Sequence, residues 1–266
     1  ENEIKYLCEI AKPNYGIITN IGKAHLEGFK NIEGVKKTKK ELYDYIKINR
    51  GKIFVNNEDA ILNEISKDID TISYGLNGEI NGIVKESSIF TNVQFNSHII
   101  ETQLIGTFQF YNIMLSIAVA SHFGIKLKNI SKALTTYKPN NNRSQVIKTE
   151  SNTIILDAYN ANPSSMYEMI YSFSKVQNKN KICILGDMAE LGKYSEKEHL
   201  NIIHLLEKLK IKCLFVGNEF SKHNKNNSFT DVYSLIDYLN SKQIKESTVL
   251  IKGSRSIALE KVVKAL

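Results

Sequence analysis

The feature that most constrains the fold is a regular alternation of apolar, strand-like runs with helix-like segments in the second half of the chain. After residue 140, short runs rich in β-branched residues recur, and each is followed by a segment with apolar residues at helical spacing. Strands are expected at 153–157, 181–185, 212–216 and 248–251, and helices at 164–176, 195–209, 231–240 and 256–265. Strands that are apolar throughout are typical of sheets covered on both faces. The pattern therefore predicts an α/β fold with a mostly parallel sheet.

The first half of the chain predicts a shorter alternation that ends in hairpins. Strands are expected at 16–21, 52–56 and 71–75, a polar loop at 22–31, and helices at 32–48 and 58–66. Between 82 and 104, short apolar runs alternate with turn residues, which favours antiparallel hairpins. Two more helices are expected, one at 110–123 that ends at Gly124 and one at 129–137.

The strongest signal for a domain boundary is the segment 138–142, in which Pro139 is followed by three asparagines. We therefore expect two domains, over residues 1–139 and 140–266. A chain of 266 residues with 42% hydrophobic residues is long enough for two sizeable cores.

The charge balance is basic but does not favour a nucleic-acid partner. Lys and Arg number 35 against 28 Asp and Glu, which gives a net charge of +7. The lysines are spread along the chain and interleaved with acids, as on ordinary solvated helix faces. Arginine occurs at positions 50, 143 and 255 alone. These three residues are candidates for contacts that need a planar guanidinium and that a lysine ammonium cannot make.

Other protein classes are also disfavoured. No apolar run reaches the ~18 to 20 residues of a membrane span. Cys8, Cys183 and Cys213 are odd in number and scattered, which argues against a disulfide framework or a zinc site and fits a reducing cytoplasm. The chain opens on Glu1 without an initiator Met, so this residue is not expected to be the natural start.

Polar residues gather directly after three of the expected strands. The segment 157–163 follows the first, 186–192 follows the second with two acids between two glycines, and 252–255 follows the last and opens the last expected helix. Ligands of α/β proteins bind at the carboxyl ends of parallel strands, and a Lys and an Arg at a helix N-terminus suit an anion. The pattern predicts a ligand site, although Asn-rich turns and glycines that merely permit tight turns would look similar.

Two candidates lie in the first half, where the common nucleotide signatures are absent. His25 lies just beyond the strand expected at 16–21, and Lys39 lies on a Lys-rich helix; alone, each is as well explained as a loop or surface residue. The sequence contains neither a Gly-x-Gly-x-x-Gly fingerprint nor a Gly-x-x-x-x-Gly-Lys-Ser/Thr P-loop.

Taken in order, the motifs resemble the Mur ligase family, and within it the MurF type. The Tyr-Asn-Ala-Asn, Leu-Gly-Asp-Met-x-Glu-Leu-Gly and Lys-Gly-Ser-Arg strings are specific to this type among the ligases. The matching pieces cover nearly the whole chain: residues 12–13, 18–22 and 24–27, Lys39, Glu41-Leu42, Tyr111-Asn112, Arg143, 159–163, 185–192 and 252–255.

The resemblance implies a partial central ATP-binding domain over 1–139 and a Rossmann-like C-terminal ligase domain over 140–266. It also implies an ATP-dependent ligase of peptidoglycan precursor synthesis that uses Mg²⁺. Such an enzyme phosphorylates a carboxylate of UDP-N-acetylmuramoyl-tripeptide, and D-alanyl-D-alanine then attacks the acyl phosphate to form an amide. Cations and fixed dipoles are needed around the phosphates.

The resemblance also assigns roles to residues on the metal and nucleotide side. His25 corresponds to a Mg²⁺-ligating histidine, and Lys39 to a lysine that family members can carry as a carbamate, which supplies the anion that a hard Mg²⁺ site requires. Together with Arg143, these two residues are the expected catalytic groups. The residues expected at ATP are Asn112 by the adenine, Arg143 at the phosphates, Asp157 at the ribose, and Tyr159.

The remaining matched residues are expected on the substrate side. Asn160 and Asn162, like Tyr159, correspond to residues that line the cleft between the domains. The dipeptide and muramoyl-peptide ends of that cleft are expected to involve Asp187, Glu190, Lys252 and Arg255.

The sequence also departs from the family pattern. Leu156 and Ala158 stand where family members usually have Asp and Ser, and the string 106–110 differs from the usual Gly-x-His-Asn type. The UDP-sugar-binding domain, the P-loop and an acidic Mg²⁺ ligand that precede the matched region in the family are missing, so we expect the chain to be inactive alone and to need that N-terminal portion. Two alternatives stay open: a folylpolyglutamate-synthase-like ligase, and a non-catalytic remnant that binds nucleotide or peptide.

Overall fold

The computed structural model describes residues 2–23, 26–85, 89–178 and 180–266. The chain forms two compact units: unit 1 comprises Glu1–Lys23 and Gly28–Tyr137, and unit 2 comprises Ala24–Glu27 and Lys138–Leu266. Each unit has hydrophobic cores of its own.

The main sheet of unit 1 is parallel and has the order β1-β2-β3-β4. Its strands are β1 (Tyr15–Ile17), β2 (Lys52–Asn56), β3 (Asp70–Gly75) and β4 (Ile80–Asn81). The strand expected at 16–21 is shorter, because pairing ends at Ile17. Ile18 and Ile21 are nevertheless buried, since they pack into a core with α3 (Ile32–Ile48) rather than pair in the sheet.

One face of this sheet packs on α3 and α4 (Ala60–Ile65). The α3 helix begins after Asn31, whose side chain accepts a hydrogen bond from the Gly34 N–H at 2.9 Å. The sequence did not indicate α1 (Glu3–Ala11), and the polar loop expected at 22–31 contains the short helix α2 (Leu26–Phe29). The Glu41 carboxylate accepts hydrogen bonds from backbone N–H groups at the start of α1, so a contact distant in sequence holds this helix.

The other face of the sheet packs on α5 (Gln109–His122), a strongly apolar helix followed by Gly124 in the left-handed region (φ 77°), as the sequence predicts. The hairpin prediction is confirmed by an antiparallel sheet of β5 (Ile83–Lys85), β6 (Asn92–Phe95) and β7 (His98–Ile100). Helix α6 (Leu127–Thr136) packs against the same core.

Unit 2 has a sheet of order β12-β11-β10-β13-β9-β8, parallel except for the edge strand β8, which is antiparallel to β9. Its strands are β8 (Gln145–Lys148), β9 (Asn152–Asp157), β10 (Lys181–Gly186), β11 (Lys212–Val216), β12 (Ser228–Phe229) and β13 (Ser247–Lys252). The predicted α/β class with a mostly parallel sheet is confirmed.

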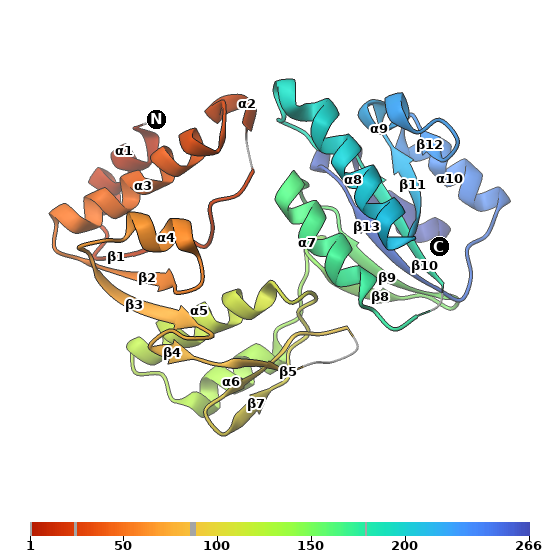
Figure 1. Cartoon of the computed structure of the whole chain (residues 1–266). Helices are drawn as coiled ribbons and strands as arrows, with labels where there is room; N and C mark the ends of the chain where they lie inside the picture. The colour runs from red at the N-terminus through yellow and green to blue at the C-terminus, as the bar shows by residue number, and fades with distance from the viewer. Residues whose placement is uncertain (1, 24–25, 86–88, 179) are drawn as a thin grey trace. The chain divides into compact units, whose positions relative to one another are not determined.

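Helices cover both faces of this sheet (Figure 1). One face packs on α7 (Pro163–Ser174) and α8 (Ser195–Leu209), and the other on α10 (Val232–Ser241) and the C-terminal segment. The short helix α9 (Asn218–His223) follows β11, and a 3₁₀ turn (Gly192–Tyr194) precedes α8.

The α-helix expected at 256–265 is wrong in type. The chain there forms two 3₁₀ segments, Arg255–Ile257 and Leu259–Ala265, separated by Ala258 in the left-handed region (φ 56°). The break lets Leu259 and Val262 pack fully into the core beneath the sheet. Within the residues described above, no helix combines the length and apolar character needed to cross a membrane.

Candidate active site

The three polar loops expected to meet do lie side by side at one edge of the unit 2 sheet. They follow β9, β13 and β10, which are consecutive in the sheet order and parallel, so their carboxyl ends share one edge. This is the edge at which α/β folds bind ligands. Bonds across the loops hold them together: the Ser254 N–H donates to the Asp187 carbonyl at 3.2 Å, and the Ala189 N–H donates to Ser254 Oγ at 2.8 Å.

An ion pair joins the end of β13 to the end of β9. Lys252 Nζ lies 2.6 Å from Asp157 Oδ2 and donates a second hydrogen bond to the Asn160 carbonyl at 3.2 Å. The other carboxylate oxygen, Oδ1, accepts from the Ser144 N–H at 2.9 Å and faces Ser144 Oγ at 3.3 Å. Lys252 is 2% exposed, so its ammonium is buried with these partners inside unit 2.

This placement changes the expected anion site at 252–255. Lys252 ends the strand instead of opening an α-helix, and only a three-residue 3₁₀ turn follows. Arg255 is exposed, with its guanidinium 3.6 Å from Glu260. Gly253 and Gly186 are not among the glycines with positive φ, so neither forms a left-handed turn. A Cβ on Gly253 would lie 3.0 Å from the Gly186 Cα, which shows that these glycines allow two loops to approach closely.

Arg143 and Tyr159 form a stacked pair. The guanidinium carbon lies 3.8 Å from the Tyr159 ring centroid, and the Tyr159 N–H donates to the Asn142 carbonyl at 3.1 Å. A guanidinium that stacks on a ring keeps its in-plane N–H donors directed outward. The exposed Arg143 therefore presents its donors in a fixed orientation, so its side chain loses little conformational entropy on binding an anion.

The two asparagines of the 157–163 loop shape that loop and the helix after it. Asn160 Oδ1 accepts from the Ala161 N–H at 2.8 Å. Asn162 is the N-cap of α7, where its Oδ1 accepts from the Ser165 N–H at 2.9 Å. Pro163 occupies the first helical turn, as the sequence predicts.

Asp187 anchors α9 through both of its carboxylate oxygens. Oδ2 accepts from the Glu219 N–H at 2.9 Å and Oδ1 from the Phe220 N–H at 3.0 Å, which satisfies donors at the start of that helix. Gly217, which directly precedes α9, has φ 122°. A Cβ at this position would lie 2.3 Å from the carboxylate carbon of Asp187. Glu190, on the same loop, is exposed and has φ 61°.

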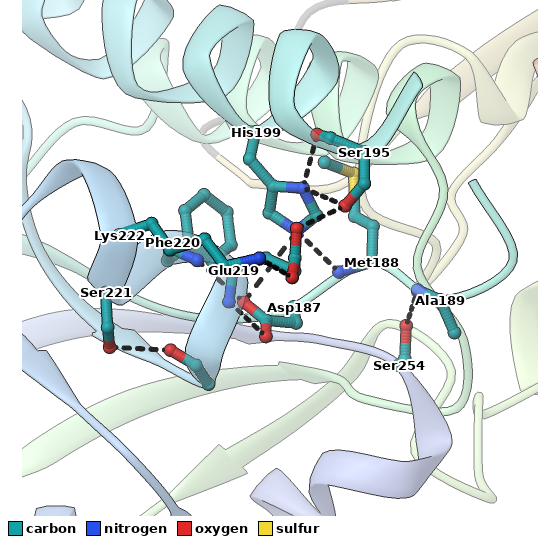
Figure 2. A network of polar contacts seen from close by, with 11 residues as sticks. Asp187, Met188, Ala189, Ser195, His199, Glu219, Phe220, Ser221, Lys222 and Ser254 are labelled. Atoms are coloured by element: carbon teal, nitrogen blue, oxygen red, sulfur yellow. Dashed lines mark hydrogen bonds and ion pairs between the residues drawn. The ribbon is translucent and has the colours of Figure 1, made fainter. Parts of the chain in front are cut away.

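Figure 2 shows a polar network behind this loop that the sequence motifs do not predict. His199, fully buried on α8, has Nε2 3.0 Å from the Met188 N and Nδ1 2.8 Å from the Ser195 carbonyl oxygen. Ser195 Oγ donates to Glu219 at 2.8 Å, and hydrogen bonds from Lys222 and Ser195 hold the pKa of Glu219 below its usual value. A sequence signal did exist, because His199 lies on the face of α8 that carries Ile202, Ile203 and Leu206.

The structure describes two of the three candidates in the first half of the chain. His25 lies outside the described residues. Lys39, on α3, is half-buried and donates to the Asn20 carbonyl at 2.7 Å, and burial lowers the pKa of its ammonium. Asn112, exposed on α5, donates from Nδ2 to Gln109 Oε1 at 2.8 Å.

Two of the cysteines that look scattered in the sequence are neighbours in space. Cys183 on β10 and Cys213 on β11 are directly paired residues of adjacent strands. Both are free, buried thiols whose pKa is raised by burial. They pack in the core away from the loop edge.

Comparison with known proteins identifies the class. Residues 1–120 match the profile of the Mur ligase middle domain, and residues 142–255 match that of the Mur ligase, glutamate ligase domain. The chain belongs to the Mur ligase family.

Within the family, curated relatives that match nearly the whole chain bear one name. The chain is 28% identical over its whole length to UDP-N-acetylmuramoyl-tripeptide–D-alanyl-D-alanine ligase of Bacillus subtilis and 31% identical to that of Haemophilus influenzae, and it covers 62% of each. The crystal structure of MurF from Acinetobacter baumannii superposes with a TM-score of 0.86 at 26% identity, over 99% of this chain and 62% of that one. MurF from Thermotoga maritima, solved in complex with ADP, shares the fold at 22% identity with a TM-score of 0.84, over 99% of this chain and 64% of that one. The chain thus spans about 62% of the length of the curated relatives it matches.

Proposed function

We propose that the chain is the middle and C-terminal portion of an ATP-dependent ligase that joins D-alanyl-D-alanine to UDP-N-acetylmuramoyl-tripeptide. The observation that carries the proposal is the match, over the full length of the chain, to ligases that bear this name. The cross-linked polar loops at the carboxyl edge of the unit 2 sheet support it, because they supply a built site where the fold binds ligands.

On the nucleotide side, Arg143 is the best-supported residue. Its stacking on Tyr159 aims a planar set of donors outward, which suits a phosphate better than an ammonium would. Asp157 is proposed for the ribose. Its Oδ1 and Oδ2 are already oriented by Ser144 and Lys252, so it would meet a hydroxyl as a fixed acceptor. Asn112 is proposed beside the adenine.

On the substrate side, the proposed residues differ in how exposed they are. Glu190 and Arg255 are exposed and are proposed to contact the peptide substrates directly. The remaining four hold the loops in place through the contacts described above, and we propose that they shape the substrate surface chiefly in that way: Asn160, Asn162, Asp187 and Lys252.

Lys39 fits the proposed carbamate by its environment. Only the neutral amine reacts with CO₂, and burial lowers the pKa of Lys39 and so increases the neutral fraction. As a carbamate it would be a Mg²⁺ ligand together with His25. In the ranges 2–23, 26–85, 89–178 and 180–266 no cluster of three His, Cys, Asp or Glu side chains is arranged for a metal.

When bound, ATP supplies the phosphoryl group that converts the tripeptide carboxylate to an acyl phosphate. The residues of this chain would orient the reactants and neutralise charge: Arg143 at the phosphates, and the loops after β9, β10 and β13 around the substrates.

We further propose that an N-terminal ligase portion packs on unit 1. Tyr6, Leu7 and Ile10 on one side of α1 are each more than half exposed, and in the described part of the sheet β1 pairs with β2 alone. Open strand edges and clusters of exposed apolar side chains are surfaces that proteins normally cover.

The proposal is tested by examining the reading frame that encodes the chain and by assaying the extended protein. A Gly-x-x-x-x-Gly-Lys-Thr segment within the preceding ~100 to 200 residues, about one domain's length, is expected. The protein extended to include it should form ADP and the amide product only when both substrates are present. An extended protein that binds nucleotide or peptide without ligating them would instead establish a non-catalytic binding protein.

A further inference from the structure

His199 is a buried titratable residue to which the proposed function gives no task. It is fully buried on α8, and its ring packs edge-on against Phe220 with a centroid distance of 4.6 Å. Both of its ring nitrogens have partners on the protein backbone, namely Met188 and Ser195.

These two partners fix the protonation state of the ring. The Ser195 carbonyl can only accept, so Nδ1 carries the proton. The Met188 N–H can only donate, so Nε2 presents its lone pair. One tautomer of the neutral imidazole satisfies both contacts, whereas an imidazolium would set two N–H donors against each other at Nε2.

The charges around the ring do not reverse this conclusion. Asp187 Oδ1 lies 3.7 Å from Nε2, and Glu219 and Asp187 favour the charged ring, whereas His223 on α9 disfavours it. Burial outweighs the carboxylates and lowers the pKa of His199. Asp187 is also already engaged by the N–H groups of Glu219 and Phe220.

The partner of Nε2, the Met188 N–H, belongs to the loop 187–191. Met188 and Leu191 of this loop are buried, while Ala189 and Glu190 face outward. The hydrogen bond to His199 therefore fixes the loop from behind, as the bond from Ala189 to Ser254 fixes it from the side.

We propose that His199 is a positioning residue: as the neutral Nδ1–H tautomer it fixes the Met188 backbone and so the loop that presents Glu190, and protonation of the ring releases that loop. The inference that His199 positions the loop rests on contacts within unit 2 alone. The consequence for substrate binding rests on the proposed function.

The first test uses the 266-residue chain and needs no ligase activity. Histidine ¹⁵N shifts between pH 5 and 8 report the tautomer, and amide exchange reports the hydrogen bond at Met188. His199→Leu removes both ring contacts. His199→Gln keeps an acceptor near the position of Nε2 but does not titrate. His204→Gln changes an exposed histidine on the same helix and is the matched control.

We expect neutral His199 to show an unprotonated Nε2 and a protonated Nδ1. Exchange at Met188 should be about tenfold faster in His199→Leu, since loss of a backbone hydrogen bond with a buried acceptor shifts local opening by about that factor. In the parent, protonation of His199 at low pH should lower the protection of the Met188 amide relative to its intrinsic exchange rate. His199→Gln should restore slow exchange and should not show this loss of protection at low pH. His204→Gln should match the parent. A protonated Nε2 at neutral pH, or exchange in His199→Leu equal to that of the parent, would overturn the proposal.

A second test addresses the consequence for the substrate. In the extended ligase, His199→Leu should raise KM for D-alanyl-D-alanine severalfold while KM for ATP stays within twofold, and His199→Gln should recover most of the loss. Unchanged KM values would refute a role in binding. An inactive parent enzyme would count against the proposed function and would leave the exchange result intact.

Discussion

At the scale of single residues, the Lys252–Asp157 pair shows how charge holds the candidate site together. One ammonium and one carboxylate connect β13, β9, the Asn160 carbonyl and the Ser144 backbone. Ser144 directly follows Arg143, so this buried pair also fixes the chain that carries the exposed guanidinium. Because the groups satisfy each other, removing either one leaves the other poorly solvated.

We expect Lys252→Met to destabilise unit 2 strongly. The substitution keeps the length of the side chain but leaves the Asp157 carboxylate without its ion-pair partner. Breaking such a pair costs about 3–5 kcal/mol. Urea unfolding followed by circular dichroism measures the change. Lys264→Met, at an exposed lysine, is the control and should be near neutral. Asp157→Asn in the Lys252→Met background should recover part of the loss; full stability of Lys252→Met alone would show that the pair does not hold the loops.

The buried His199 predicts a pH dependence of stability. Its pKa is lowered in the folded chain, so the unfolded chain binds the proton more readily. The contribution of His199 is therefore complete above its unfolded pKa, about 6.5, and is lost as the pH falls below that value toward the folded pKa. Urea unfolding of the parent and of His199→Gln between pH 5 and 8 should show a smaller decline in the variant. Parallel curves for the two proteins would remove His199 as the cause.

Arg143→Lys should lower turnover in the extended ligase. A lysine keeps the charge but loses the planar stacking on Tyr159 and the two-pronged contact to phosphate. Loss of a charge-assisted hydrogen bond corresponds to ~1.5–3 kcal/mol, which is about 10- to 150-fold in kcat/KM. Steady-state kinetics with Arg50→Lys as the control, at an arginine to which no role is assigned, separates this effect from a general loss of guanidinium. Equal rates for both variants would take Arg143 out of the phosphate site.

At the scale of elements, α9 is a helix too short to be stable alone, and contacts at its first turn hold it in place. Asp187 accepts from two of its N–H groups, and Phe220 packs on His199 and Phe215. The approach of the Asp187 carboxylate requires that position 217 carry no Cβ. This helix therefore connects the loop after β10 to the loop after β11.

We expect Gly217→Ala to detach α9 and the loop after β10. Its φ of 122° is a conformation that side chains rarely adopt, and the added Cβ would overlap the Asp187 carboxylate. Backbone strain alone costs about 1–3 kcal/mol, and the overlap adds to it. Gly124→Ala is a useful comparison, because Gly124 also has positive φ but a Cβ there meets nothing within 4 Å. Amide exchange in α9 should rise sharply in Gly217→Ala alone; a Gly217→Ala chain as protected as the parent would show that the contact can relax.

The elements that the sequence did not reveal share a physical cause. The strands and helices of unit 2 with strong apolar periodicity were predictable to within a few residues, and so was the convergence of three loops at one edge. In contrast, α1 depends on the distant Glu41 carboxylate, α9 on Asp187, and β8 on pairing with β9. The candidate site residues were predicted from motifs that resemble those of the family, but the ion-pair partner of Lys252 and the backbone partners of His199 depend on packing that no local pattern encodes.

At the scale of the whole molecule, the residues proposed for the nucleotide and its Mg²⁺ are divided between two units with separate cores. Unit 1 carries Lys39 and Asn112, and unit 2 carries Arg143, Asp157 and Tyr159. None of these residues substitutes for the phosphate-binding backbone and lysine of a P-loop, which the sequence does not contain. The groups proposed to bind ATP are thus present without the P-loop that would cradle the transferred phosphoryl group.

The 266-residue chain alone is therefore expected to release no phosphate from ATP when UDP-N-acetylmuramoyl-tripeptide and D-alanyl-D-alanine are supplied. Phosphoryl transfer depends on positioning and on charge stabilisation around the γ-phosphate, and the chain supplies a guanidinium but no cradle. A coupled phosphate assay measures this, with the extended protein as the positive control at equal concentration. Substrate-dependent release by the chain alone, abolished by Arg143→Lys but not by Arg50→Lys, would show that its own residues suffice and that the missing P-loop is not needed.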